Sequence, residues 1–151
     1  MNIWNKFKAL ELGEQIVFVG SLIAIIGAFL PWYSDTDQFK TGTTFLGITG
    51  PLYLAGLLVL LANTACLTAV IMKMRGSDSL PVRENYLFIG SSAMTLFMMV
   101  MAASVYFHPK FGINIADKQW GAGMVMVAIA GLCVMAGGFA LAGLTGFFGY
   151  I

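Results

Sequence analysis

The sequence predicts an all-α membrane protein built as a bundle of four transmembrane helices. Of its 151 residues, 59% are hydrophobic and only 10% are charged, whereas soluble domains carry about 25% charged residues. A bilayer core about 30 Å thick requires about 20 apolar residues in a helix that rises about 1.5 Å per residue. Four stretches satisfy this requirement and contain no Asp, Glu, Lys, Arg or His: 15–34, 41–72, 85–107 and 119–151.

The chain is short enough that we expect one membrane domain over residues 1–151, with transmembrane helices over about 15–33, 51–72, 86–106 and 120–149. Segment 1–14 comes before them and places Ile3, Trp4 and Phe7 at helical spacing between polar residues. Such a segment either lies in the headgroup region as an interfacial helix or extends the first transmembrane helix into water. Both alternatives fit the sequence.

Aromatic residues and proline mark the expected helix ends. Trp and Tyr favour the boundary between membrane and water, and proline is tolerated in the first turn of a helix, as Pro51 would be. We therefore expect four aromatic side chains to anchor the protein at the membrane surface: Trp4, Trp32, Tyr33 and Trp120.

The distribution of basic residues predicts the orientation. Short loops rich in Lys and Arg remain in the cytoplasm. The segments before the first helix and between the second and third carry Lys6, Lys8, Lys73, Arg75 and Arg83. The other two loops carry only Lys40, Lys110 and Lys118. Five basic residues against three predict that both termini are cytoplasmic.

The two outer loops predict a small β-structure. Residues 38–46 alternate in polarity, are rich in Thr and contain Gly42 near their centre, a pattern that favours a β-hairpin. Because an isolated hairpin is marginally stable, we expect residues 109–116 to contribute a third strand. The result would be a small β-hairpin cap on the outer face.

Small residues form stripes on the first and fourth helices. Such residues let membrane helices approach closely, so the stripes predict packing surfaces, either within one bundle or against another subunit. Asn63, the most polar side chain near the middle of a helix, should form an interhelical hydrogen bond; a substrate site is the alternative. The predicted packing residues are Gly20, Ala24, Gly27, Ala28, Asn63, Gly138, Ala142 and Gly146.

The sequence contains no recognisable catalytic or metal-binding pattern. His108 has no companion ligand, and Cys66 and Cys133 lie singly within helices, where buried thiols act as small apolar side chains. Met94 and Met98 have a spacing that resembles copper transporters, although methionine is also an ordinary packing residue. An enzyme would have to rely on outer-loop acids such as Asp35 or Asp117. We expect no catalytic residues, metal or cofactor.

The passages Leu12-Gly-Glu-Gln-Ile16 and Ile26-Gly-Ala-Phe-Leu-Pro-Trp-Tyr33 resemble small uncharacterised bacterial four-span proteins, whose first helix leaves the membrane at Leu-Pro-Trp. This resemblance implies a multi-pass protein of a prokaryotic inner or plasma membrane. The layout is also similar to claudin-like tetraspans, which implies comparable architecture only, because the first outer loop lacks the claudin Gly-Leu-Trp motif and cysteine pair.

These features favour a non-enzymatic structural or assembly protein. It would associate with itself or with a larger membrane complex through small-residue helix faces and outer loops. The expected partners are the lipid bilayer and a homo-oligomer or larger complex; a net charge of +1 offers no basic field for nucleic acid. The alternative is a small transporter or channel for an apolar or uncharged substrate, because charged side chains that usually mark ion pathways are missing from the four stretches.

Overall fold

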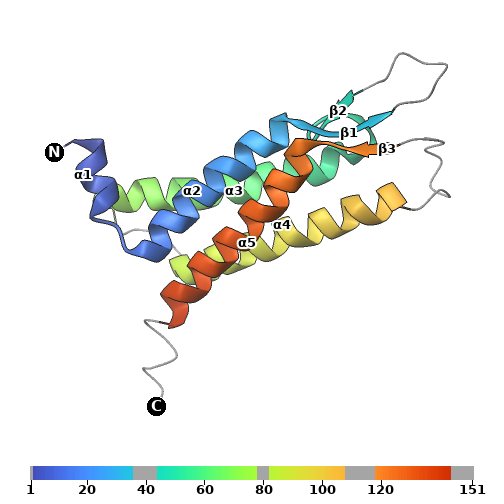
Figure 1. Ribbon diagram of the computed structural model, residues 1–151. Helices are drawn as coiled ribbons and strands as arrows, with labels where there is room; N and C mark the ends of the chain where they lie inside the picture. Colours follow the sequence, from blue (N-terminus) through green and yellow to red (C-terminus); the bar gives the residue numbers. More distant parts are fainter. Residues whose placement is uncertain (1, 36–43, 78–81, 108–117, 144–151) are drawn as a thin grey trace.

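The computed structural model describes residues 2–35, 44–77, 82–107 and 118–143. Within these residues, four long helices run side by side (Figure 1), and each is long and apolar enough to cross a membrane. The chain is a multi-pass membrane protein. The four helices are α2 (Leu12–Phe29), α3 (Tyr53–Met74), α4 (Glu84–Phe107) and α5 (Ala122–Ala142).

The helices form a ring in which each packs mainly against two neighbours. α2 contacts α5 and α3, while α4 contacts the same two helices, and the α2–α5 contact is the most extensive. α2 and α4 begin at one end of the bundle, where α3 ends, and we name this the charged end. The opposite end carries a small sheet and is named the sheet end (Figure 1).

Local chemistry sets the two ends of α2. Glu11 is the N-cap, and it forms a capping box with Glu14, so the helix begins before residue 15. It ends at Phe29 because Leu30 is extended, with φ −89° and ψ 162°. A residue before proline is disfavoured in the helical conformation, and Pro31 follows. The expectation of a helix up to residue 33 is therefore wrong.

The other helices differ from the expected ranges by shorter amounts. Gly50–Leu52 forms a 3₁₀ turn that contains Pro51, and α3 begins directly after it. Trp120 belongs to a strand rather than to the fourth helix, which begins at Ala122. Gly146 and the remainder of the expected fourth span lie outside the described residues.

Three strands form a sheet of order β2-β1-β3. β1 (Pro31–Asp35) is central and pairs antiparallel with both β2 (Thr44–Leu46) and β3 (Lys118–Trp120). A small β-structure after the first helix was expected, but its first strand lies at Pro31–Asp35 rather than inside 38–46. The expected hairpin centre at Gly42 and third strand at 109–116 lie outside the described residues.

The N-terminal segment forms a separate short helix, α1 (Ile3–Lys8), which is set at an angle to α2 (Figure 1). Helix α1 ends at the C-cap Ala9, and α2 begins only at Leu12. The alternative in which this segment simply extends the first transmembrane helix is therefore wrong. The Phe7 ring packs against Phe18 of α2, with ring centroids 5.4 Å apart.

The interior contains two apolar clusters, one toward each end. The cluster at the sheet end includes Trp32, Tyr33, Val59, Met99 and Val127. The cluster at the charged end includes Val17, Cys66, Val70, Phe88 and Val134. Polar groups between and beyond these clusters must find partners within the protein, because lipid offers none.

Candidate functional site

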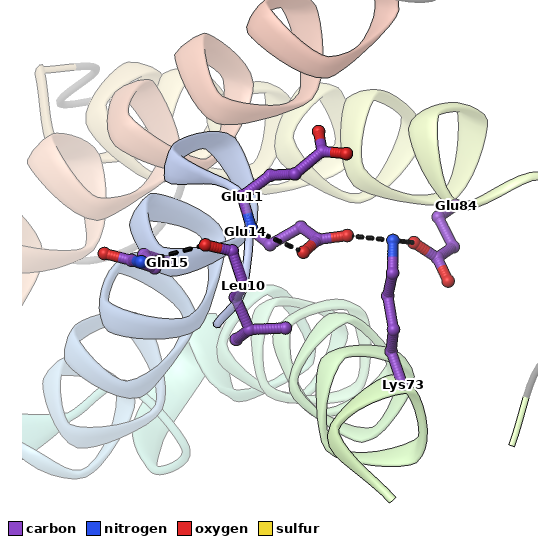
Figure 2. A network of polar contacts seen from close by, with 6 residues as sticks. All are labelled: Leu10, Glu11, Glu14, Gln15, Lys73 and Glu84. Carbon is purple, nitrogen blue, oxygen red and sulfur yellow. Dashed lines mark hydrogen bonds and ion pairs between the residues drawn. The ribbon is translucent and has the colours of Figure 1, made fainter. Parts of the chain in front are cut away.

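Three ionisable side chains meet at the charged end (Figure 2). Lys73, in the last turn of α3, forms an ion pair with Glu14 of α2. The same ammonium lies 3.2 Å from an Oε2 oxygen of Glu84, the first residue of α4. This cluster, named the Glu14–Lys73–Glu84 bridge, ties together three of the four transmembrane helices.

The backbone of α2 positions Glu14 within the bridge. The Glu11 backbone N–H donates to Glu14 Oε2 at 3.0 Å, and the Gln15 side-chain amide donates to the Leu10 carbonyl at 2.9 Å. Both bonds fold the residues before α2 back onto its first turn (Figure 2). Glu14 therefore uses one carboxylate oxygen to cap its own helix and the other to bind Lys73.

The charges also match the helix dipoles. Glu14 and Glu84 lie in the first turns of α2 and α4, where the positive end of the dipole favours an anion. Lys73 lies in the last turn of α3, where a cation is favoured. Each of the three charges is thus stabilised by its own helix as well as by its partner.

The three side chains of the bridge differ in how deeply they are buried. Glu14 is only 1% exposed, while the side chains of Lys73 and Glu84 are 37% and 26% exposed. A buried carboxylate without a partner is strongly destabilising, so Glu14 depends on Lys73. The Lys73–Glu84 contact is more accessible to water and contributes less.

A cavity of about 310 Å³ opens beside the bridge. Two cationic and two anionic side chains reach it, so its wall charges are balanced. The lining residues are Lys6, Ala9, Leu10, Glu11, Glu14, Lys73 and Met74. Among the described residues, no group of three or more His, Cys, Asp or Glu side chains is arranged to hold a metal ion.

A second polar contact lies deeper in the bundle. The Asn63 side-chain amide donates to the Val59 carbonyl at 2.8 Å and to Thr95 Oγ1 of α4 at 3.0 Å. Thr95 donates in turn to the Ser91 carbonyl. Asn63 is 1% exposed, and its Oδ1 oxygen has no partner among the described residues. This contact links α3 to α4 without any charge.

The predicted small residues of α2 lie against α5. A Cβ atom added at Gly20 would lie 2.9 Å from Val134 Cγ2, and one at Gly27 would lie 2.7 Å from Val127 Cγ2. Ala24 and Ala28 are completely buried. Close approach of the two backbones therefore requires this stripe, which explains why α2 and α5 form the largest helix contact.

The small residues of α5 serve two neighbours. A Cβ at Gly137 would lie 2.7 Å from the Gly13 carbonyl of α2, whereas one at Gly138 would lie 3.0 Å from Ile89 of α4. Ala142, at the end of α5, is half-buried. Small residues on more than one face of α5 are thus occupied by contacts inside a single bundle.

The four predicted membrane anchors divide into two pairs. Trp4 on α1 and Trp120 on β3 are 59% and 44% exposed, so both are accessible at the surface. Trp32 and Tyr33 are 0% and 3% exposed, and their assignment as anchors in contact with headgroups is wrong. A shift in strand register between Pro31 and Tyr33, typical of a β-bulge, lets two consecutive side chains be buried.

Specific contacts hold the two buried aromatics. Trp32 Nε1 donates to the Gly27 carbonyl at 3.0 Å, which fixes β1 onto the end of α2. Tyr33 stacks on Phe45 of β2, with ring centroids 4.9 Å apart. Its hydroxyl has no partner among the described residues, and burial raises the pKa of Tyr33 to about 12.

The remaining candidates do not form a site. Met94 is exposed, whereas Met98 is half-buried and packs against the apolar cluster at the sheet end. Cys66 is buried and Cys133 is exposed, and both are free thiols. Asp35 lies at the end of β1, whereas His108 and Asp117 lie outside the described residues.

Sequence reasoning missed the Glu14–Lys73–Glu84 bridge, although a signal was present. Each of these residues is immediately next to an uncharged stretch: Glu14 precedes residue 15, Lys73 follows residue 72 and Glu84 precedes residue 85. In a four-helix antiparallel arrangement these three borders meet at one end. No protein-family model matches the chain, and no curated protein matches it.

Proposed function

We propose that this chain is a non-enzymatic structural or assembly protein of a prokaryotic inner or plasma membrane, with both termini in the cytoplasm. It associates with itself, or with a larger membrane complex, through small residues on an outward helix face and through its outer loops. The observation that carries this proposal is a stripe on α5, where Cys133, Ala136 and Ala140 are all exposed.

This outward stripe differs from the small residues already described. Gly20, Gly27 and Gly138 are occupied inside the bundle and are inaccessible to another subunit. Ala136 and Ala140 are four residues apart, the spacing at which small side chains let two membrane helices approach. No described helix covers them, so a second copy of α5 can pack there.

Cys133 provides a built-in reporter for the contact. It is exposed on the stripe, whereas Cys66 is completely buried. Oxidation of native membranes with copper–phenanthroline should therefore produce a disulfide-linked dimer through Cys133. The dimer should disappear in Cys133→Ser and fall sharply in Ala136→Leu, but persist in the control Gly90→Leu, which changes a different face.

Maleimide labelling in SDS, after the oxidation step, counts the Cys133 thiols that remain unlinked. If all Cys133 thiols label and neither homodimers nor cross-links to other proteins form, the assembly role fails. Ala140→Leu offers an independent test on the same stripe. It should weaken cross-linking as Ala136→Leu does, because either leucine would hold the two backbones apart.

The second candidate is a transporter or channel for an uncharged substrate. Its support is the buried Asn63 Oδ1 oxygen, which has no partner among the described residues and lies between two apolar clusters. Asn63→Leu removes this acceptor and also the bond to Thr95. If uptake of every tested uncharged solute into proteoliposomes is the same for Asn63→Leu and wild type, this candidate is rejected.

A further inference from the structure

We infer that an apolar groove between α3 and α4 binds an acyl chain of an anionic phospholipid, with the phosphate held at Arg83. The groove has a volume of about 500 Å³. Its walls are almost entirely apolar, and it opens toward the lipid. The lining residues are Leu58, Leu61, Ala62, Val82, Tyr86, Leu87, Gly90, Ser91 and Met94.

The groove is long enough to hold an acyl chain across at least one lipid leaflet. From Glu84, the first residue of α4, to the lining residue Met94, the helix rises about 15 Å at about 1.5 Å per residue. One leaflet contributes half of a hydrocarbon core about 30 Å thick. Along α4, the groove therefore runs from the charged end of the bundle to near the membrane midplane. Along α3 it continues about 7 Å further, because Leu58 lies five residues beyond Asn63, which is level with Thr95 of α4.

Two basic residues lie at the charged end of the bundle, where the groove begins. Arg83 directly follows the lining residue Val82 and is exposed. Its backbone carbonyl accepts the backbone N–H of Leu87 at the start of α4. Arg75, which caps the end of α3, is also exposed. Among the described residues, neither guanidinium pairs with a carboxylate, because Glu84 is engaged by Lys73.

Charge and shape together favour an anionic phospholipid over other occupants. Arg83, Leu87, Gly90 and Met94 recur at the spacing of one helical face, so Arg83 continues the row of residues that lines the groove on α4. Guanidinium groups bind phosphate oxygens in a two-point geometry. Basic residues at the end of a groove between membrane helices are the arrangement that anionic headgroups recognise.

Gly90 keeps the groove open. A Cβ atom added at this position would have no atom within 4 Å, so the space beside it is available to a ligand. Gly90→Leu would place a side chain in the groove, and its Cβ atom would meet no neighbouring atom. This makes Gly90 a suitable position for blocking the groove while preserving the fold.

The test uses the full-length protein in a mild detergent and native mass spectrometry with added phosphatidylglycerol or phosphatidylcholine. Wild type should retain phosphatidylglycerol more strongly. Arg83→Gln should weaken phosphatidylglycerol binding about fivefold, since one basic residue near an anionic surface contributes about that factor. It should leave phosphatidylcholine binding unchanged. Gly90→Leu should reduce the retention of both lipids by a similar factor, because the added side chain occupies the space of the acyl chain.

Two control variants match these changes. Ala122→Leu adds the same side chain at an exposed position of α5, and Lys8→Gln removes a basic charge on α1. Both should bind the two lipids as wild type does. Equal retention of the two lipids by wild type would overturn the inference, as would equal effects of Gly90→Leu and Ala122→Leu. Loss of a protein dimer in Gly90→Leu, with lipid binding unchanged, would assign the groove to a second copy instead.

Discussion

At the charged end, ionised side chains hold three helices together, whereas at the sheet end aromatic rings and backbone hydrogen bonds fix the chain. Glu14 is buried because Lys73 neutralises it. Trp32 is buried because its ring fits the end of α2 and its N–H reaches the Gly27 carbonyl. At the charged end, removing an ionic partner should therefore lower the stability of the fold. At the sheet end, stability should instead fall when a well-fitting buried ring is made smaller.

The largest expected effect follows from removing the cation of the bridge. Lys73→Ala leaves Glu14 buried without its ionic partner, which should lower the free energy of unfolding by about 3 kcal/mol. Exposure of the Lys73 side chain to water keeps the loss at the lower end of the range for buried pairs. Denaturant unfolding in detergent micelles, followed by circular dichroism, measures it.

Arg75→Ala is the matched control, because Arg75 lies two residues further along the chain, is exposed and pairs with no described carboxylate. It should change stability by less than about 0.5 kcal/mol. The double variant Glu14→Gln with Lys73→Met should recover most of the loss, because no fully buried charge is left without a partner. Glu84 also loses Lys73, but its side chain is 26% exposed. Equal effects of Lys73→Ala and Arg75→Ala would show that the bridge does not stabilise the bundle.

A smaller loss of stability is expected when a buried aromatic ring at the sheet end is made smaller. Trp32→Phe keeps an aromatic ring but removes the Nε1–H donor and leaves unfilled space, which should cost about 1–2 kcal/mol. Trp4→Phe makes the same chemical change on the exposed helix α1 and should cost less than about 0.5 kcal/mol. Thermal unfolding of the two variants in the same detergent compares them directly.

The sequence predicts both tryptophans to be membrane anchors, and only the structure shows that Trp32 is buried whereas Trp4 is exposed. If Trp32→Phe and Trp4→Phe were equally mild, Trp32 would behave as a surface anchor after all. The opposite order would show that α1 is more important for stability than the junction between β1 and α2.

The same comparison shows what sequence can predict in this protein. Four uncharged stretches predict four transmembrane helices, because charge is costly in lipid at every position along them. The glycine stripe that includes Gly20 and Gly27 predicts a close helix contact, but periodicity does not say which helix is the neighbour. Here the neighbour is α5 of the same chain.

The details of both ends depend on tertiary contacts. Glu14 and Lys73 are 59 positions apart, and the ring order of the helices, rather than local sequence, brings them together. Trp32 follows Pro31, which predicts a break in the helix but not the strand that then returns the ring to the bundle. For Glu14 and for Trp32, the local sequence looks the same whether the side chain lies at the membrane surface or is buried in the protein.

The smallest effect at neutral pH is expected at Tyr33. Its buried hydroxyl has no partner among the described residues, so Tyr33→Phe should leave stability unchanged or raise it by up to about 1 kcal/mol. The ring stack on Phe45 is retained in this variant. A loss above about 1 kcal/mol would show that the hydroxyl makes a stabilising bond.

At alkaline pH the buried Tyr33 hydroxyl should affect the stability of the protein, because burial raises the pKa of Tyr33 from 10.0 to about 12 in the folded protein. Below pH 10.0 the phenol is neutral in both states, and its contribution is fully present. As the pH rises from 10.0 to about 12, the unfolded phenol ionises first, so wild type loses stability relative to Tyr33→Phe. The measurement is the difference in melting temperature between the two proteins at each pH, in one detergent. Lys73 and the other titrating groups are present in both proteins, so their contributions cancel in this difference. Parallel curves would mean that Tyr33 is exposed to water in the membrane protein, and the sheet end would then be less closed than the charged end.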